Sequence, residues 1–532
     1  MSNNKRRSST ESSNALSNEI EKRPRSETTD SWIDWLKSNI SLTTLSPTIS
    51  AEQEEQQQEE EEIVDESVEQ TKQSVWSWLG YGLTAKEGSR ESITTDNVVL
   101  PLFDTQFKPA SVSTSLFSKT VQAIQSVLFQ QKKPTQSIID SLRENPEKRI
   151  VVIGVHGWFP MKLVRSMMGE PTGTSAKFCQ QMILAIQTYF KEGYEWNIPD
   201  HMITAIPLTW EGKVLERVEH LYKLILDTWA DTLRSADIVV WATHSQGTPV
   251  STILLQRLIQ ESLVDPKRQP ICMLAMAGIS HGPFPTLKTS VFVKYFEADA
   301  ARELFEFMKS DTPISTQYHE AMVFILQQRI KVVFVGSMQD QVVPLYSAIM
   351  SGISHPNILR AVYMDGHVYA PDDFLIRLIS FAIQLLNLGL SDHGFLIHIS
   401  EVLAGNLYAL EGGHSTIYEE LKVFQLPLRY LFEASPCGQL ELPRVYLEDD
   451  KKKQRVIEQV EARLDPFNAK ARLNPFHLPW AMRGIWDDPR ILQNDQLRTE
   501  LETLQTLFEQ WNPSSARLKE IKFRLEPLKA RL

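Results

Sequence analysis

The chain has 532 residues, of which 42% are hydrophobic, so it is long enough for more than one unit and for a sizeable core. Its net charge of −11 is mostly local, because residues 51–70 hold ten acidic and no basic side chains, and the balance gives no support for a nucleic-acid-binding surface. The three cysteines, in a chain without a C-x-x-C pair, exclude a disulfide framework and a zinc site of that type.

Few cysteines fit a reducing compartment. The N-terminus is polar and charged and has no apolar stretch of the kind that secretory signals contain. The longest charge-free apolar run lies between Arg377 and Asp392 and is too short to span a bilayer. We therefore predict a soluble, cytoplasmic protein, and a peripheral contact with membranes stays open.

Residues 1–90 have the composition of a disordered region, rich in Ser, Thr, Asn, Glu and Gln. Two tryptophan pairs interrupt it, "SWIDWL" at 31–36 and "VWSWLGYGL" at 75–83. Such pairs could be binding motifs or membrane-interface anchors, or the second pair could dock on the domain that follows. We predict an acidic, Ser-rich N-terminal region with Trp motifs.

Apolar strands alternate with amphipathic helices between residues 91 and 390. Strands are predicted at 149–155, 202–208, 237–243, 271–277, 331–336 and 359–364, and helices at 174–190, 213–233, 249–259 and 372–388. Continuous apolar strands separated by helices are typical of a parallel sheet that is covered on both faces. The predicted fold class is therefore α/β, with a mostly parallel sheet and helices on both faces.

Two segments depart from this alternation. Residues 281–329 are more apolar than a surface loop and are predicted to be an inserted lid or cap. Residues 391–532 are predicted to be a mainly helical extension, in which Leu497, Leu501, Leu504, Phe508 and Trp511 repeat at helical spacing. A basic, amphipathic second helix follows Pro513. It either packs on the body or binds a partner or an anionic membrane surface.

The stretch "THSQG" at 243–247 lies between a predicted strand and a predicted helix. A serine on such a sharp turn is exposed above the sheet as a nucleophile. The pattern G-x-S-x-G holds at Gly247, while Thr243 replaces the first glycine and adds crowding. We predict Ser245 as the nucleophile, with Thr243 and Gly247 shaping the turn.

An acid and a histidine follow the next strands in the order that this chemistry needs. Asp340 in "MQDQVVP" lies 95 residues after Ser245, and His367 in "DGHVYAP" lies 27 residues later. His367 is predicted to be the general base and Asp340 the acid that orients it. Rival acids are Asp365, Asp372 and Asp373. Rival histidines are His281 and His414, both of which we expect to be structural or lid residues.

Acyl transfer also needs donors for the oxyanion. "VHGWFP" at 155–160 ends the first strong strand, and Gly157 permits a sharp turn. The backbone N–H groups of Trp158 and Gln246 are the predicted donors. The sequence has no H-E-x-x-H motif and no P-loop, so we predict no metal and no cofactor.

The motifs "VHGWFP", "THSQG", "MQDQVVP" and "DGHVYAP" together resemble the α/β-hydrolase superfamily and, within it, the intracellular lipase-like serine esterases. The resemblance covers roughly residues 145–390, and the whole chain looks like a fungal member. It implies a Ser-His-Asp triad, an acyl-enzyme and hydrolysis of a small-molecule or lipid ester. The alternative is a catalytically inactive hydrolase fold that serves as an interaction or membrane-recruitment module, which the tails favour.

Overall fold

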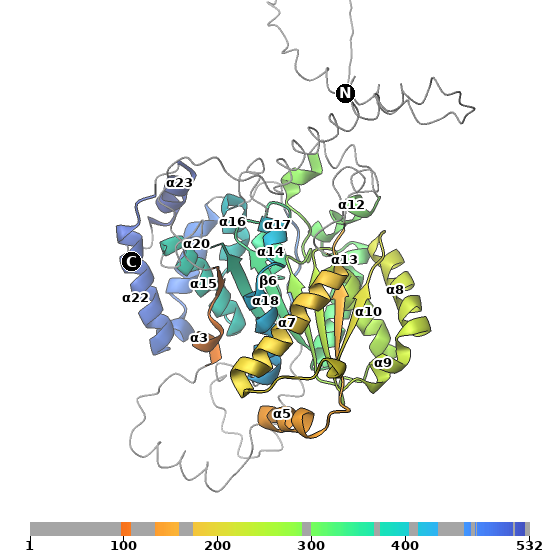
Figure 1. The fold of residues 1–532 in the computed structure, drawn as a ribbon. Helices are drawn as coiled ribbons and strands as arrows, with labels where there is room; N and C mark the ends of the chain where they lie inside the picture. Colours follow the sequence, from red (N-terminus) through yellow and green to blue (C-terminus); the bar gives the residue numbers. More distant parts are fainter. Residues whose placement is uncertain are drawn as a thin grey trace, which may run out of the picture. The chain divides into compact units, whose positions relative to one another are not determined.

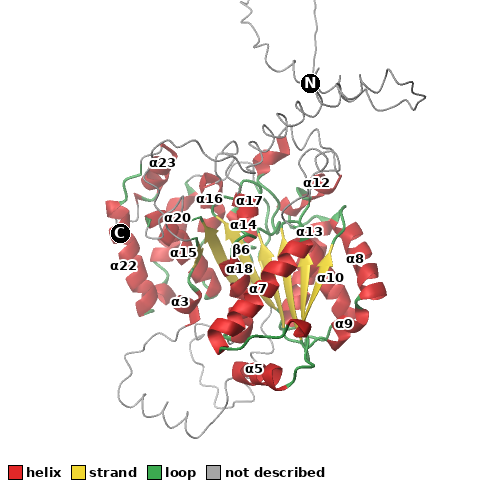
Figure 2. Cartoon of the chain, viewed as in Figure 1, coloured by secondary structure: helices red, strands yellow, loops and turns green. Residues whose placement is uncertain are grey.

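A seven-stranded sheet forms the centre of the described chain, in the order β1-β8-β6-β5-β4-β2-β3 (Figures 1 and 2). Its strands are β1 (Val98–Leu100), β2 (Ile150–Val155), β3 (Ile203–Leu208), β4 (Ile238–His244), β5 (Ile271–Met276), β6 (Lys331–Ser337) and β8 (Ile358–Met364). All neighbours are parallel except β1, which pairs antiparallel with β8. The computed structural model describes residues 97–107, 134–158, 174–289, 299–365, 373–403, 413–434, 462–469, 474, 476–513 and 516–526.

Alternate side chains of each central strand enter two separate cores. In β2, Val151 and Ile153 face one core, while Ile150 and Val152 face the other. Every residue of β2, β4, β5 and β8 is buried. Because both faces are covered, these strands are apolar throughout. The predicted fold class is confirmed, and the six predicted strands are present with ends within one residue of the prediction.

Helices cover each face of the sheet (Figure 2). One face carries α5 (Pro134–Glu144), α7 (Ser175–Tyr194) and α18 (Leu421–Phe432). The other carries α8 (Val214–Thr228), α10 (Gly247–Gln260), α13 (Pro313–Gln327) and α15 (Phe374–Asn387). The predicted helix at 213–233 is two helices, because the backbone leaves the helical region at Trp229 (φ −122°, ψ 1°) before α9 (Ala230–Ser235) begins.

The predicted lid contains a core helix. Its later half is α13, which is buried against α10 and connects β5 to β6. Its described earlier part contains only η2 (Pro285–Thr289), α12 (Asp299–Glu303) and η3 (Glu306–Met308). A lid function, which stays a prediction, is therefore restricted to the residues before α13.

The predicted boundary at residue 390 does not separate two packing units. Beyond it, α18 packs on β5, β6 and α7, so it belongs to the sheet's own cover. The remaining described helices are α3 (Phe103–Phe107), η1 (Asp200–Met202), α14 (Leu345–Ala348), α16 (Phe395–Leu403), α17 (Gly413–Thr416), α20 (His477–Trp486), α21 (Pro489–Leu492), α22 (Asp495–Gln510) and α23 (Ala516–Arg524).

The two predicted C-terminal helices are α22 and α23. The apolar stripe of α22 packs on α15, where the Phe374 and Phe508 rings lie 5.2 Å apart. Arg377 of α15 also forms a two-pronged ion pair with Glu500 of α22. In the described residues α22 thus packs on the body of the protein. No helix among those residues is long and apolar enough to cross a membrane.

A short segment, residues 462–469, crosses back over the body and is called the strap here. Its strand β9 (Arg463–Leu464) pairs antiparallel with β7 (Ile353–Ser354). Ser310 and Phe467 exchange two hydrogen bonds. The strap contains the sequence "RLDPF" at 463–467. The similar sequence "RLNPF" at 472–476 lies largely outside the described residues, and residues 1–96 with their Trp pairs lie outside them entirely.

Candidate active site

Ser245 lies at the turn between β4 and α10 in a left-handed backbone conformation, with φ of 54°. A non-glycine residue in this region is strained, and such strain is typical of a nucleophile on an elbow. The turn is held on both sides, because Ser245 N–H donates to Met276 O at 3.0 Å and its carbonyl accepts from Thr248 N–H at 3.1 Å. The structure therefore has the strand–turn–helix geometry that the motif predicts.

Gly247 allows three chain segments to meet under the elbow. A Cβ on Gly247 would lie 2.6 Å from Val155 O and 2.7 Å from both His156 O and Thr243 Oγ1. Backbone atoms at such distances leave no room for a side chain. The predicted structural role of Gly247 follows from this contact.

Thr243 fits at the tight point of the turn because two of its neighbours, Gly247 and Ala275, are small. Its Oγ1 occupies the space that a Gly247 side chain would need, and its partner across the sheet on β5 is Ala275. The side chain is fully buried, and among the described residues Oγ1 has no hydrogen-bond partner. Gly247 thus makes room for the threonine that replaces the first glycine of the motif.

Asp340 follows β6 and is almost completely buried. Its Oδ1 accepts hydrogen bonds from the N–H groups of Val342 and Val343, both at 2.8 Å. Its Oδ2 lies 2.8 Å from Nδ1 of His414. Two backbone donors fix the carboxylate, and its second oxygen is directed at one imidazole.

The histidine beside Asp340 is His414, from α17. His367 lies outside the described residues, so its position relative to Asp340 stays a prediction. The approach of α17 is close, because a Cβ on Gly413 would lie 2.2 Å from Gln339 O. The His414 side chain remains 17% exposed. From the sequence, His367, which follows β8, is the favoured base, and His414 is expected to be a structural or lid residue. In the structure His414 is hydrogen-bonded to Asp340.

His244 links this histidine to the nucleophile's turn. Its Nε2 donates to His414 O at 2.9 Å, and the two rings lie 4.5 Å apart. Burial lowers the pKa of His244 well below its usual value, and the adjacent His414 lowers it further. A neutral His244 with its proton on Nε2 supports the backbone of His414. His244 directly precedes Ser245, so His414 contacts the residue next to the predicted nucleophile.

Two of the rival residues, Asp373 and His281, have other surroundings. Asp373 caps α15 by accepting from Leu375 N–H at 2.8 Å. His281 is buried under the strap, where its ring stacks on Phe467 at 4.2 Å. Burial, with His319 nearby, lowers the pKa of His281 to about 3. Asp372 lies outside the described residues.

The segment 156–158, called the oxyanion loop here, passes directly beside the elbow. A Cβ on Gly157 would lie 2.9 Å from Ser245 Cβ. Gln246 is fully buried, and Trp158 is half-buried at the end of a described segment. The structure thus brings Gly157 next to Ser245, while the donor roles of the Trp158 and Gln246 N–H groups stay predictions.

Arg217 was missed in the sequence analysis and is a fully buried, charged side chain next to this loop. Its Nη1 donates to Gln246 Oε1 at 2.8 Å and its Nη2 to His156 O at 2.8 Å. The only signal in the sequence is an arginine on the apolar face of the helix predicted at 213–233. Without the contacts seen in the fold, this arginine cannot be distinguished from an ordinary surface arginine.

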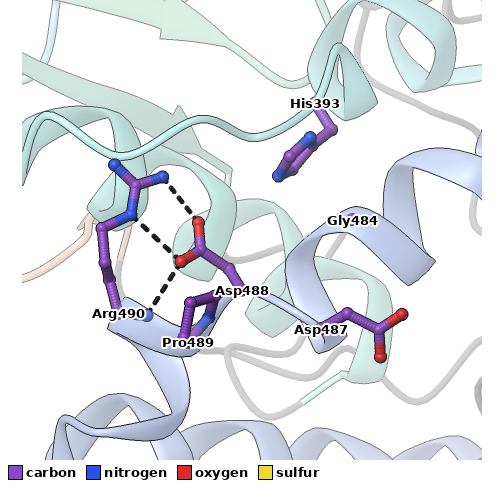
Figure 3. Close-up of a pocket in the computed structure, with 6 residues that line it drawn as sticks. All are labelled: His393, Gly484, Asp487, Asp488, Pro489 and Arg490. Carbon is purple, nitrogen blue, oxygen red and sulfur yellow. Dashed lines mark hydrogen bonds and ion pairs between the residues drawn. The ribbon is translucent and has the colours of Figure 1, made fainter.

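An open pocket of about 430 Å³ lies elsewhere, on the C-terminal helices (Figure 3). His393, Gly484 and Asp487 line it, together with the Asp488–Arg490 ion pair. None of the predicted catalytic residues lines this pocket. Within the described ranges, no group of three or more His, Cys, Asp or Glu side chains could hold a metal ion.

A comparison with models of known protein families assigns the chain to one family. Residues 100–489 match the family model described as the YMC0/YMC35 alpha/beta hydrolase domain. No curated protein matches the chain.

The solved structures that are similar to parts of the chain include two from different organisms. One is the phospholipase PlaB from Legionella pneumophila in complex with thio-NAD, with 13% identity and a TM-score of 0.26 over 36% of this chain and 38% of that chain. The other is a cutinase-like protein from Cryptococcus sp., with 13% identity and a TM-score of 0.20 over 46% of this chain and 96% of that chain. The chain thus spans less than two fifths of the phospholipase.

Proposed function

Because the chain belongs to the YMC0/YMC35 family of α/β hydrolases, we propose that it is a serine hydrolase that cleaves an ester through an acyl-enzyme on Ser245. The observation that carries the proposal is the hydrogen bond between Asp340 Oδ2 and His414 Nδ1, next to a strained serine elbow. An acid, an imidazole and a serine on a strained turn are the three parts that this chemistry needs. Ser245 itself is buried, whereas the motif predicted an exposed serine.

His414 serves as the general base in this proposal, in place of the predicted His367. A carboxylate that accepts from Nδ1–H leaves the lone pair on Nε2 to receive a proton. Asp340 keeps its own orientation through Val342 and Val343, so the ring is held in one plane. His367 remains the alternative base, and the two histidines are distinguished by substitution.

The reaction follows from these roles. Ser245 Oγ attacks the ester carbonyl while His414 takes its proton, and the carbonyl electrons move to the oxygen. The N–H groups of Trp158 and Gln246 stabilise this oxyanion, and a donor of this kind contributes roughly 3 kcal/mol. The tetrahedral intermediate collapses, the C–O bond breaks, and His414 returns the proton to the leaving alcohol. Water then repeats the sequence on the acyl-enzyme and releases the acid.

An ester panel tests the activity and its chain-length preference. We expect the wild-type protein to hydrolyse p-nitrophenyl esters, with a lipid substrate favouring the longer acyl chains, and Ser245→Ala to lose the activity. Thr248→Ala, in the first turn of α10 just beyond the elbow, is a matched control that keeps the nucleophile. Equal rates in wild type and Ser245→Ala would contradict the proposal. No hydrolysis of esters or phospholipids by the wild type would favour the interaction module.

A further inference from the structure

Arg217, in the first turn of α8, connects the two elements that flank the nucleophile. We infer that Arg217 is a positioning residue that holds the oxyanion loop and Gln246 in their catalytic arrangement. The inference rests on the proposed function and adds to it a residue that does not touch the reacting atoms. It is carried by three contacts, by complete burial and by a charge that no described carboxylate pairs with.

The guanidinium group of Arg217 bridges the loop and the elbow. Nη2 donates to His156 O at 2.8 Å, and Nη1 donates to Gln246 Oε1 at 2.8 Å and approaches Gly157 O at 3.5 Å. Gln246 is held from its other end too, because Nε2 donates to Gly212 O at 3.1 Å. One rigid, planar group thus fixes the spacing between the residues that supply the two predicted donors.

Carbonyl contacts also set the direction of the N–H groups. In a planar trans peptide the C=O and the following N–H point in opposite directions. A donor that draws Gly157 O to one side therefore directs the Trp158 N–H to the other. His156 Nδ1 donates to the same carbonyl at 2.6 Å, and Arg217 anchors His156 through its own carbonyl. Arg217 and His156 together determine how this peptide is turned.

Within the described ranges no carboxylate forms an ion pair with Arg217, and its Nε has no hydrogen-bond partner there. Burial lowers the pKa of Arg217 to about 9, so the side chain is still charged at neutral pH. A buried, unpaired cation costs stability, and an apolar side chain would pack at lower cost. Its positive potential favours the negative charge that develops on the oxyanion.

Arg360 is the matched case without a link to the site. It is also buried and donates to main-chain carbonyls, from Nε to Ile349 O at 2.9 Å and from Nη2 to Met350 O at 3.2 Å. Burial lowers the pKa of Arg360 to about 10, and in contrast to Arg217 a nearby carboxylate, that of Asp392, partly offsets this by favouring the charged form. Comparing substitutions of Arg217 and Arg360 therefore distinguishes a contribution to stability alone from a contribution to catalysis.

The test compares the steady-state kinetics of Arg217→Met, Arg217→Lys and Arg360→Met on the best p-nitrophenyl ester. We expect Arg217→Met to lower kcat by about 10²-fold with KM within about threefold, since the lost contact matters most in the transition state. Arg217→Lys keeps the charge but loses the two-pronged guanidinium donor, so its decrease in kcat should be intermediate. Arg360→Met should lower the thermal midpoint and leave kcat unchanged.

A second readout reports the oxyanion hole directly. A trifluoromethyl ketone forms a tetrahedral adduct with serine, and its affinity should fall in parallel with kcat in Arg217→Met. The matching methyl ketone, which binds without that adduct, should bind equally well. If Arg217→Met does not fold, Arg217→Lys decides, with an expected loss of kcat of at least about fivefold.

Two results would overturn the inference. One is a kcat within twofold of wild type in Arg217→Met, or in Arg217→Lys where the Met variant is unfolded. The other is an equal loss of affinity for both ketones. A wild-type protein that neither hydrolyses esters nor binds the trifluoromethyl ketone would instead overturn the proposed function on which the inference depends.

Discussion

At the scale of single residues, the elbow depends on the absence of a side chain at Gly247. Gly247 faces two carbonyl oxygens and the hydroxyl of Thr243, all within 2.7 Å of a hypothetical Cβ. Ser245 accepts a positive φ directly beside it. The threonine that departs from the G-x-S-x-G pattern is accommodated because this one glycine is kept.

Gly247→Ala should therefore damage the elbow. Its methyl group would overlap Val155 O and His156 O, so β2 and α10 must separate, and we expect a loss of roughly 2–4 kcal/mol in the free energy of unfolding. Esterase activity should fall with it, because the same shift moves Ser245 from the oxyanion loop. Urea unfolding and ester hydrolysis measure both effects.

Gly193 is the matched control for this substitution. It lies in α7, and nothing lies within 4 Å of a Cβ built there. Gly193→Ala should be neutral or stabilise the protein by up to about 1 kcal/mol, because alanine favours helix. If the two variants unfolded at the same urea concentration, the steric account of the elbow would not hold.

At the scale of elements, the strap shows how a distant segment completes the body. Phe467 covers the ring of His281, which lies in the loop after β5, and the strap is fastened by the β7–β9 pair and by Ser310. This burial keeps His281 uncharged in the folded protein. Burial likewise lowers the pKa of the neighbouring His319, to about 4.

This packing predicts a loss of stability in acid. The folded His281 binds a proton only near pH 3, whereas the unfolded residue does so near its ordinary value of 6.5. Between these values the unfolded state binds more protons, so stability decreases as pH falls from 6.5 toward 3. From His281 alone we expect a loss of about 2 kcal/mol between pH 7 and pH 5.

Urea unfolding at pH 5, 6 and 7 measures this dependence. His281→Gln cannot titrate and should show a smaller decrease than the wild type, by about the 2 kcal/mol assigned to His281. The remaining slope includes His319, whose contribution has the same sign. An identical pH dependence in both proteins would show that the covered imidazole does not control acid stability.

At the scale of the whole molecule, periodicity predicted the sheet well because its strands are long and apolar. β2 has no polar residue, and the polar residues of β4, Thr243 and His244, lie only at its end, so the strand ends could be placed to within a residue. The two-residue β7 and β9 carry no periodic signal, and the break at Trp229 has no proline or glycine to mark it. The sequence of α18 has no feature that indicates its packing against the sheet, which only the structure shows.

The residues of the candidate site could be predicted where they follow the strands and not where they depend on packing. Ser245 and Asp340 come directly after β4 and β6, so chain order alone indicated them. His414 lies 74 residues beyond Asp340 on a four-residue helix, and no local pattern assigns it to the acid. Arg217 is likewise identified only by contacts with residues far away in sequence.

The central claim is that Ser245 is activated by the histidine that Asp340 holds. The measurement that tests it most directly is the rate at which a fluorophosphonate probe labels the wild type, Ser245→Ala, His414→Ala and His367→Ala, with the modified residue identified by mass spectrometry. We predict an adduct on Ser245, none in Ser245→Ala, and a decrease of at least about 10³-fold in His414→Ala, with His367→Ala close to wild type. Wild-type labelling in His414→Ala together with its loss in His367→Ala would contradict the account.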